Sequence, residues 1–398
     1  MLRFMKKEKE TVLCKEMRDN KLMKTIVILT GRYLPGYKDG GPVRTLINLT
    51  ECLGDRYRIK IVANDRDHGD VKAYKDIKYN QSNKVGKAEV WYVKPGGFRV
   101  ATIVELTKDA DMIYVCGPYD DYAYKTLLLK KLKKINKPIV IASMGSFSEG
   151  AFNIKSKKKS IFIKTAKVLG LFKSVTWSVT SDLEEMDVKR IIGENAKCII
   201  AEDLPRAVPV LKNKSLGNNI KIIFVSRISK KKNLSYAIEV LSKVTNDIIF
   251  DIYGPIEEKE YWEKCKRSLQ ELPSNVRWKY KGMADSEKII ELFSQYDIFL
   301  FPTRGENFGH VIFEALAGGC IPIISDQTPW NDLKDCSCGE VISLSSQDLF
   351  AEAINRLARL PKDELWSMQR RANEYAKKKY ENSVANTGYI KIFEKVLK

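Results

Sequence analysis

Short apolar segments alternate with helix-like segments along nearly the whole chain, and this rhythm begins twice. The first series opens at residues 24–31 (KTIVILTG), and the second restarts at 221–226 (KIIFVS). Repeated strand–helix–strand units form a parallel sheet with helices on both of its faces. The sequence therefore predicts an α/β chain of two doubly wound domains with a cleft between them.

The predicted strands are short apolar runs, and most of them are separated by segments with helical periodicity. In the first series they cover residues 24–31, 58–63, 88–93, 112–116 and 138–142, with helices at 42–53, 123–134 and 181–192. In the second series they cover residues 221–226, 248–253, 276–280, 297–301 and 321–324.

The break between the two series falls at residues 203–219, which hold two prolines, a glycine and an asparagine pair but no apolar periodicity. We therefore predict a first domain at 24–205 and a second domain at 206–380. A charged leader at 1–23 precedes them. The last segment, 381–398, has apolar residues at helical spacing, and we expect it to cross back to the first domain.

Size and composition agree with two globular domains. A chain of 398 residues is too long for one ordinary core, and its 44% hydrophobic and 30% charged residues argue against disorder or a fibrous repeat. The sequence has no apolar run of roughly 18 residues and no apolar signal-peptide core. The eight cysteines are scattered, which favours buried thiols in a reducing compartment. We expect a cytoplasmic protein.

The positive charge is concentrated in the first half. Residues 1–200 hold 39 Lys and Arg against 23 Asp and Glu, whereas residues 201–398 hold 30 against 27. The net charges of +16 and +3 indicate that the first domain meets an anionic partner. Two lysine runs, at 130–134 and 155–159, form either a solvated basic face or a contact with the inner face of the cell membrane. No nucleic-acid-binding pattern accompanies the charge.

The most informative segment is 301–319, FPTRGENFGHVIFEALAGG. An apolar strand ends at Pro302, a polar loop follows, and a helix is predicted to begin near Phe308. Ligands of open α/β sheets bind at the carboxyl ends of strands, and the first turn of a helix suits a phosphate. Glu306 lies before the helix and Glu314 lies inside it, so both carboxylates can accept hydroxyl hydrogen bonds from one ligand.

The alternative is that Glu306 caps the helix and that Glu314 is an ordinary surface residue. The neighbours of Glu314 are apolar, and a carboxylate in such a stretch usually has a partner. This favours a binding role for Glu314.

A basic segment, VSRISKKKN, follows the strand at 221–226. Arg227 lies just past the strand, and Lys232 lies at the start of the next helix. A departing diphosphate needs positive charge, which a planar guanidinium and a mobile ammonium supply. The alternative is a solvated basic turn.

A glycine-containing loop, GRYLPGYKDGGP, joins the first predicted strand to the first predicted helix. Gly40 and Gly41 allow the backbone to approach a ligand closely at the helix start. The loop is not the G-x-G-x-x-G pattern of dinucleotide-binding proteins, which argues against a nicotinamide-dependent dehydrogenase or epimerase. The alternative is an ordinary glycine turn.

Taken together, these segments resemble the retaining glycosyltransferases of family 4. The spacing from Glu306 to Glu314 and the segment ENFGHVIFEALAGGCIPI look like the donor motif of that family, and Arg227 and Lys232 match its basic pair. The resemblance covers most of residues 24–380 and is stronger in the second domain. It implies the GT-B fold, in which two Rossmann-like domains face each other across a cleft and the second binds most of the donor.

The resemblance also implies a role for each matching residue. Glu306 contacts the transferred sugar, and Arg227 and Lys232 stabilise the departing diphosphate. Glu314 binds the ribose hydroxyls. The remaining donor contacts come from the backbone of Asn307, Phe308 and Gly309, with Gly40 and Gly41 bordering the phosphates.

The implied reaction is transfer of a hexose, without a metal or other cofactor, from a nucleotide-diphosphate sugar to a glycan or lipid-linked saccharide. UDP is the expected nucleotide, and synthesis of a cell-surface polysaccharide is the expected setting. Residues 141–160 resemble the acceptor-side loop of related polysaccharide-building enzymes. The alternatives are a catalytically inactive sugar-nucleotide-binding relative and, less favoured, a basic nucleic-acid-binding protein.

The sequence departs from the family at one position. Many members place a histidine after the fourth strand of the first domain, where this chain has Gly117, Pro118 and Tyr119. The two histidines are His68, in a polar loop, and His310, inside the donor motif. The sequence therefore assigns no histidine to the transferred sugar.

Overall fold

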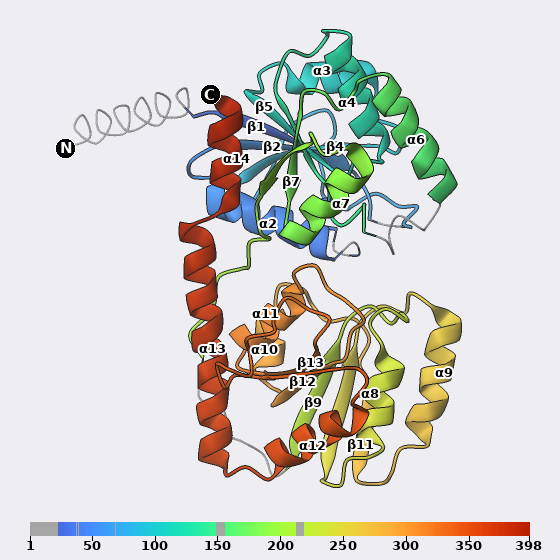
Figure 1. Cartoon of the computed structure of the whole chain (residues 1–398), viewed down its shortest axis with the longest axis vertical. Helices are drawn as coiled ribbons and strands as arrows, with labels where there is room; N and C mark the ends of the chain where they lie inside the picture. Colours follow the sequence, from blue (N-terminus) through green and yellow to red (C-terminus); the bar gives the residue numbers. More distant parts are fainter. Residues whose placement is uncertain (1–22, 37, 39, 68, 149–155, 212–218) are drawn as a thin grey trace, which may run out of the picture. The chain divides into compact units, whose positions relative to one another are not determined.

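The chain forms two compact units. The computed structural model describes residues 23–36, 38, 40–67, 69–148, 156–211 and 219–398. The first unit contains the described residues up to Leu204 together with Asn386–Lys398, and the second contains those of Pro205–Ala385. Figure 1 draws the first unit from blue to green, with its last helix in red, and the second from yellow-green to red.

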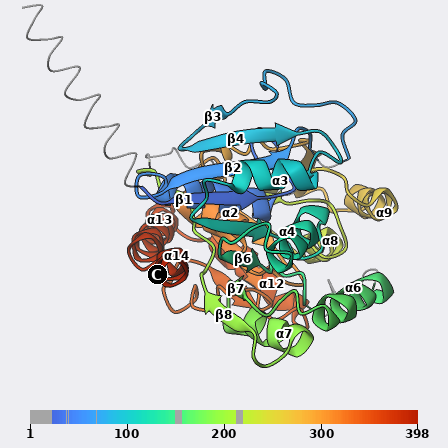
Figure 2. The same ribbon diagram turned by 90° about the horizontal axis from the view of Figure 1, so that it is seen from above.

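Strands of the first unit form one sheet in the order β3-β4-β2-β1-β5-β6-β7-β8, which Figure 2 shows from above. All neighbouring strands are parallel except β3 and β4, which form an antiparallel pair. The bounds are β1 Thr25–Leu29, β2 Arg58–Asn64, β3 Asn83–Val85, β4 Ala88–Val93, β5 Met112–Cys116, β6 Ile139–Ala142, β7 Val175–Val179 and β8 Lys197–Ile200.

Helices cover both faces of this sheet because the side chains of each buried strand alternate between two apolar layers. In β1, Ile26 and Ile28 enter the layer beneath α2 and α14, while Val27 and Leu29 enter the layer beneath the other helices. The helices are α2 (Gly41–Leu53) and α14 (Gly388–Leu397) on one face, and α3 (Val100–Thr107), α4 (Asp121–Lys131), α6 (Ser156–Val168) and α7 (Asp182–Ile192) on the other.

The sheet of the second unit has the order β11-β10-β9-β12-β13-β14, and all of its pairs are parallel. From β9 the chain adds strands in one direction, and from β12 it adds them in the other, so β9 and β12 flank the point where the winding reverses. The bounds are β9 Ile220–Val225, β10 Ile248–Tyr253, β11 Val276–Tyr280, β12 Ile298–Phe301, β13 Ile321–Ser325 and β14 Glu340–Ile342.

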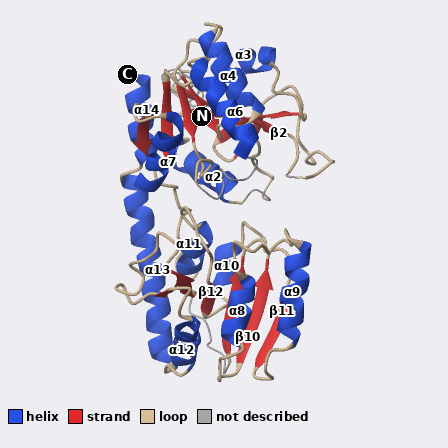
Figure 3. Ribbon diagram, turned by 45° about the vertical axis from the view of Figure 1, so that its right-hand side comes forward, coloured by secondary structure: helices blue, strands red, loops and turns tan. Residues whose placement is uncertain are grey.

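Contacts between the helices of the second unit divide them into two groups, which Figure 3 shows in blue around the red strands. One group contains α8 (Leu234–Leu241), α9 (Lys259–Gln270) and α12 (Gln347–Ala358). The other contains α10 (Ile289–Phe293), α11 (His310–Ala317) and α13 (Lys362–Ala385).

The prediction of two doubly wound α/β units is confirmed. Among the described residues, no helix is both long enough and apolar enough to span a bilayer.

The C-terminal segment contains two helices rather than one. Helix α13 ends at Ala385, and α14 starts at Gly388 after Thr387, whose hydroxyl accepts a hydrogen bond from the Tyr389 amide. A side chain at Gly388 would collide with the backbone carbonyl of Ile200 in β8. The close approach of α14 to β8 therefore requires glycine at this position and places α14 in the first unit.

Removing the ring of Phe393 tests how strongly α14 is bound to the first unit. Phe393 is fully buried, and its ring lies edge-on to Tyr57 with 5.2 Å between centroids. We expect Phe393→Ala to lower the free energy of unfolding by about 3–5 kcal/mol, as for other aromatic truncations in cores. Chemical denaturation measures the loss. The exposed neighbour Lys391 supplies the control Lys391→Ala, and equal effects of the two substitutions would contradict the assignment.

Candidate active site

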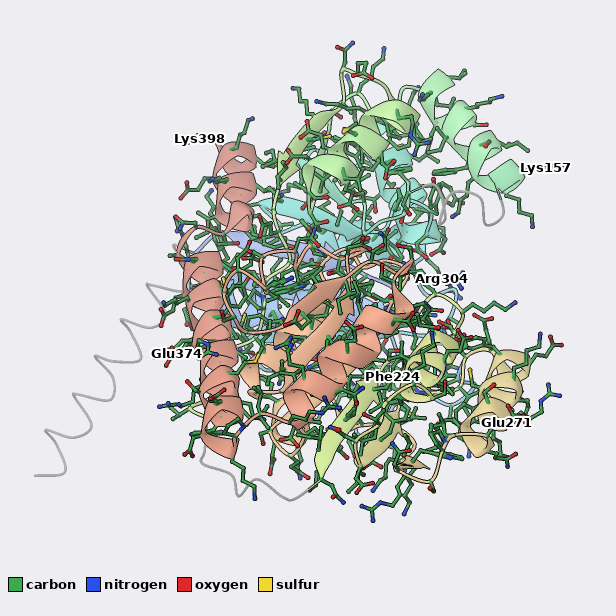
Figure 4. The ribbon with its side chains drawn as sticks, turned by 60° about the horizontal axis from the view of Figure 1, so that its bottom comes forward. Lys157, Phe224, Glu271, Arg304, Glu374 and Lys398 are labelled. Carbon is green, nitrogen blue, oxygen red and sulfur yellow. The ribbon has the colours of Figure 1, made fainter. Side chains whose placement is uncertain are left out.

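Two loops meet at the carboxyl ends of β9 and β12. The amide of Arg304 donates to the carbonyl of Lys231 over 2.9 Å, and the hydroxyl oxygen of Thr303 lies 3.3 Å from the same carbonyl oxygen. The side-chain amide of Asn233 donates to the carbonyl of Pro302 over 2.9 Å. These bonds fix the loop after β9 against the loop after β12. Figure 4 labels Arg304 in the second of these loops and Phe224 in β9.

Asn233 has a backbone conformation that few residue types adopt without strain. Its φ of 64° and ψ of 39° are left-handed, and it is the residue that immediately precedes α8. Asparagine tolerates this conformation better than most residues with a β-carbon. Asn233 therefore ends the loop before α8 through its backbone, while its buried side chain holds the neighbouring loop.

Lys232 and Glu306 form an ion pair between these two loops. The Nζ of Lys232 lies 2.5 Å from Oε1 of Glu306, and the two side chains are only 13% and 12% exposed. The hydroxyl of Thr303 donates to the same carboxylate oxygen over 3.0 Å. The carboxylate of Glu306 thus faces Lys232 and Thr303. The alternative that Glu306 caps α11 is wrong, because its carboxylate bonds Lys232 and Thr303 and no amide of α11 among the described residues.

Burial lowers the pKa of Lys232 from its usual value of 10.5, because the charged ammonium loses water. The carboxylate of Glu306 opposes this shift, while the positive charges of Lys231 and Arg227 add to it. Lys232 also lies over the ring of Phe301, 5.5 Å from its centroid. The ammonium is therefore held against one carboxylate, within an otherwise positive surrounding.

Arg227 lies at the same strand end, but its guanidinium binds another carboxylate. Its Nη1 lies 2.5 Å from Oε1 of Glu257, in a pair that is about half exposed. The structure therefore brings Lys232 and Glu306 together, and it holds the guanidinium of Arg227 in a separate ion pair close enough to lower the pKa of Lys232.

The loop Asn307–Phe308–Gly309 leads into α11, which begins at His310, two residues after Phe308. The reason is Gly309, whose φ of 80° is left-handed and interrupts the helical path. Asn307 is exposed, whereas Phe308 is buried against Trp330, with 5.4 Å between ring centroids. The indole N–H of Trp330 donates to the carbonyl of Phe308 and so fixes the backbone of this loop.

Glu314 is buried inside α11, so the alternative that it is a surface residue is wrong. Its Oε1 lies 3.9 Å from Nη1 of Arg206, which also donates to the carbonyl of Ser286 over 2.9 Å. Arg206 thus offsets the charge of a buried carboxylate. Sequence reasoning missed Arg206 because it lies in the irregular segment after β8, where no periodicity points to it.

Comparison with known proteins places this arrangement in a family. Residues 211–379 match the family model of glycosyl transferases group 1. These residues make up most of the second unit, so the second unit is similar to a group 1 glycosyltransferase domain. The prediction of a glycosyltransferase enzyme is confirmed at this level. An uncharacterized 41.2 kDa protein in the cps region of Klebsiella pneumoniae is 24% identical over 71% of this chain and 78% of its own length.

Solved structures show the same fold across both units. Sucrose-phosphate synthase from Thermosynechococcus elongatus superposes with a TM-score of 0.66 at 14% identity, covering 93% of this chain and 99% of that protein. The Anabaena protein HepE in complex with UDP and glucose superposes with a TM-score of 0.65 at 17% identity, covering 90% and 95%. This glycosyltransferase therefore has the predicted GT-B fold.

Gly40 and Gly41 belong to the first unit of the glycosyltransferase. They follow β1, which lies beside β5 where the winding of that sheet reverses, and they open α2. Both glycines are exposed, and no atom of the described residues lies within 4 Å of the point that a β-carbon would occupy at either one. Close approach of a ligand is therefore sterically possible at both residues. A phosphate contact here remains a prediction.

The segment after β5, where the resemblance to family 4 leads one to expect a histidine, holds Gly117, Pro118 and Tyr119. The hydroxyl of Tyr119 is buried without a hydrogen-bond partner among the described residues, and its ring packs against Phe147 and Phe162. His310 packs against Phe308 with 4.8 Å between ring centroids, whereas His68 and the loop residues 149–155 lie outside the described residues. Within the described chain, no three His, Cys, Asp or Glu side chains lie close enough together to hold a metal ion.

Two substitutions of Asn233 separate its hydrogen bond from its backbone conformation. Asn233→Gly removes the bond to Pro302 but tolerates the left-handed φ, and we expect a loss of about 1–3 kcal/mol in the free energy of unfolding. Asn233→Ala adds the strain of a left-handed alanine, about 1 kcal/mol more. Denaturant titration measures both values. A larger loss for the glycine variant would contradict the assignment of strain to this residue.

Proposed function

We propose that this protein is a retaining hexosyltransferase of family 4 that moves a sugar from a UDP-sugar to a glycan or lipid-linked saccharide. The proposed setting is synthesis of a cell-surface polysaccharide, in the cytoplasm at the inner face of the cell membrane. The observation that carries the proposal is the largely shielded ion pair of Lys232 and Glu306, held at the strand ends where the winding of a domain similar to group 1 glycosyltransferases reverses.

Two of the similar proteins support the finer parts of the proposal. The Klebsiella pneumoniae relative is encoded in a cps region, which supports a role in the cell surface. The Anabaena protein was solved with UDP and glucose, which supports UDP as the donor nucleotide. Both observations belong to other proteins, so the donor preference of this chain is a direct target for measurement.

In the proposed reaction, the bond between the anomeric carbon and the diphosphate oxygen breaks while the acceptor oxygen bonds the same face of the sugar. The acceptor proton passes to the departing phosphate oxygen. Negative charge develops on that phosphate, and Lys232 stabilises it together with Arg227. Neither a metal nor another cofactor has a role in this scheme.

Donor binding changes the partner of Lys232. In the structure the ammonium of Lys232 binds the carboxylate of Glu306. A diphosphate that reaches this ammonium competes with Glu306 for it, which frees carboxylate oxygens to accept hydroxyl hydrogen bonds from the sugar. Glu314, whose charge Arg206 offsets, is the proposed acceptor for the ribose hydroxyls.

The nucleotide is tested by thermal shift. A ligand that binds the folded state raises the melting temperature by mass action, so we expect UDP and one or more UDP-sugars to stabilise the protein more than GDP or ADP with their sugars. The stabilising donor is then incubated alone to measure its slow hydrolysis. Binding without any turnover would favour a catalytically inactive relative, and absence of binding by every nucleotide would refute the proposal.

Replacing Glu306 by glutamine separates turnover from binding. We expect Glu306→Gln to reduce kcat by at least about a hundredfold, the usual cost of losing one transition-state contact, while UDP affinity changes far less. Arg227→Ala should reduce both. Steady-state kinetics and calorimetric titration with UDP measure the two effects.

The matched control is Glu271→Gln, which changes an exposed carboxylate at the end of α9 that Figure 4 labels. Loss of one partner of a buried pair also destabilises proteins, by about 3–5 kcal/mol in known cases. Assays therefore run well below the melting temperature of each variant. Unchanged kcat in folded Glu306→Gln would remove Glu306 from catalysis.

The lowered pKa of Lys232 predicts how UDP binding depends on pH. Only the protonated ammonium attracts the diphosphate, so affinity should fall as pH rises through the pKa of Lys232, beginning below the value of 10.5 that is usual for lysine. In Lys232→Arg the site stays charged, and this part of the fall should vanish. Titration calorimetry at increasing pH measures both profiles. Identical profiles would show that Lys232 is not the titrating group.

A further inference from the structure

One segment of the first unit carries an unusual excess of lysine. Residues 122–181 contain 13 lysines but only one acidic residue, Glu149, which lies outside the described residues. This stretch contains α6 and all of α4 except its first residue, Asp121, which forms an ion pair with Lys125. Figure 4 labels Lys157 in α6. This segment alone therefore accounts for most of the excess positive charge of the first half of the chain.

Large apolar side chains are exposed among these lysines. On and just after α4 they are Tyr124, Leu128 and Leu132, which are four residues apart and so share one face of the helix. On and just after α6 they are Ile161, Val168 and Leu169. Exposed aromatic and aliphatic side chains that gather on one face mark an interaction site.

The C-terminal ends of α4 and α6 lie next to each other. The ammonium of Lys131, at the end of α4, donates to the backbone carbonyl of Leu169, just after α6. The opposite faces of both helices pack on the sheet through residues that include Leu127 in α4 and Ile163 in α6. Figure 1 shows the two helices as neighbours in one layer. We use the name α4–α6 surface for the exposed residues of these two helices together with the exposed residues that directly follow each helix.

We propose that the α4–α6 surface binds an anionic phospholipid bilayer, with its apolar side chains inserted among the acyl chains and its lysines on the headgroups. The proposal rests on the proposed function, because it names the surface through which the enzyme would reach a lipid-linked acceptor. Each lysine near an anionic membrane contributes about 1 kcal/mol to the free energy of binding. Stable attachment usually needs two signals, such as apolar insertion together with positive charge. The α4–α6 surface supplies both.

Nucleic acid fits this surface less well. Phosphate backbones are bound by Lys and Arg with polar side chains and backbone amides between them. Here the residues between the lysines are aliphatic, and residues 122–181 contain no arginine. Val168 is 88% exposed and Ile161 is 66% exposed, so both present apolar area that a phosphate backbone would not bury.

The neighbouring helix α7 limits the surface and supplies a matched control. It exposes Leu183 and Met186 by 68% and 66%, close to the exposure of Ile161. Unlike α6, it carries acidic residues at positions 182, 184, 185 and 187, which an anionic membrane repels. Exposed apolar side chains on α7 should therefore contribute nothing to membrane binding.

Cosedimentation of the full chain with vesicles tests the proposal. We expect binding to vesicles of phosphatidylcholine with about one-third phosphatidylglycerol, and no binding to phosphatidylcholine alone. The double variant Ile161→Ser/Val168→Ser should lower the partition coefficient at least about tenfold, given the free energy of burying aliphatic side chains. Lys157→Gln/Lys164→Gln should lower it about thirtyfold at about 0.1 M salt.

The control Leu183→Ser/Met186→Ser should bind as the unchanged protein does. Circular dichroism and melting temperature confirm that every variant is folded. Equal binding to neutral vesicles, or equal binding by the α6 variants and the control, would overturn the proposal. Binding of an RNA oligomer that survives Ile161→Ser/Val168→Ser, with no vesicle binding, would assign the surface to nucleic acid instead.

The experiments can refute the proposed membrane surface and the proposed sugar transfer independently of each other. Loss of the membrane surface should leave UDP binding and donor hydrolysis intact, because the substituted residues all lie on helices of the first unit, whereas Lys232 and Glu306 lie in the second. Vesicle binding without nucleotide binding would instead refute the proposed function and leave the membrane surface standing.

Discussion

The candidate site depends on one constraint, the attachment of the loop after β9 to the loop after β12. Hydrogen bonds that involve Asn233 and Arg304 join the loops, and they leave Lys232 facing Glu306. The strand order makes this possible, since β9 and β12 are neighbours in the sheet although the bond from Asn233 to Pro302 spans 69 residues of sequence.

An ion pair in this position is poorly explained by stability alone. Removing two charges from water costs several kcal/mol for each ion, and apolar replacements of buried pairs are often as stable or more stable. The pair holds an ammonium with a lowered pKa beside a carboxylate that has a second donor in Thr303. Such an arrangement suits a site in which an anionic ligand takes over the ammonium and leaves the carboxylate to a hydroxyl-rich group.

The two units carry different kinds of surface. The second unit has a nearly balanced charge and holds largely shielded charged residues near its strand ends, as with Lys232, Glu306 and Glu314. The first unit carries the lysine excess on helices that cover one face of its sheet. Substitutions that test the proposed sugar transfer and the proposed membrane attachment therefore fall in different units.

The sequence by itself determined most of the strands and the type of fold. Parallel strands buried on both faces are continuous apolar runs, so β5 and β10 occur at the predicted residues, as do β4 and β11 with their alternating patterns. Shorter strands such as β8 and β14 were not predicted, because three or four partly exposed residues are too few to show a hydrophobic periodicity. The sequence also identified Lys232, Glu306 and Glu314 as residues of interest from their places beside strand ends.

Only the tertiary structure decided which charged groups meet. It paired Lys232 with Glu306, gave Arg227 to Glu257 and brought Arg206 to Glu314, a partner that no spacing indicated. It also set the C-terminal ends of α4 and α6 side by side through Lys131 and Leu169. Local apolar periodicity fixes where an element forms, whereas contacts between distant residues depend on the order in which strands and helices pack.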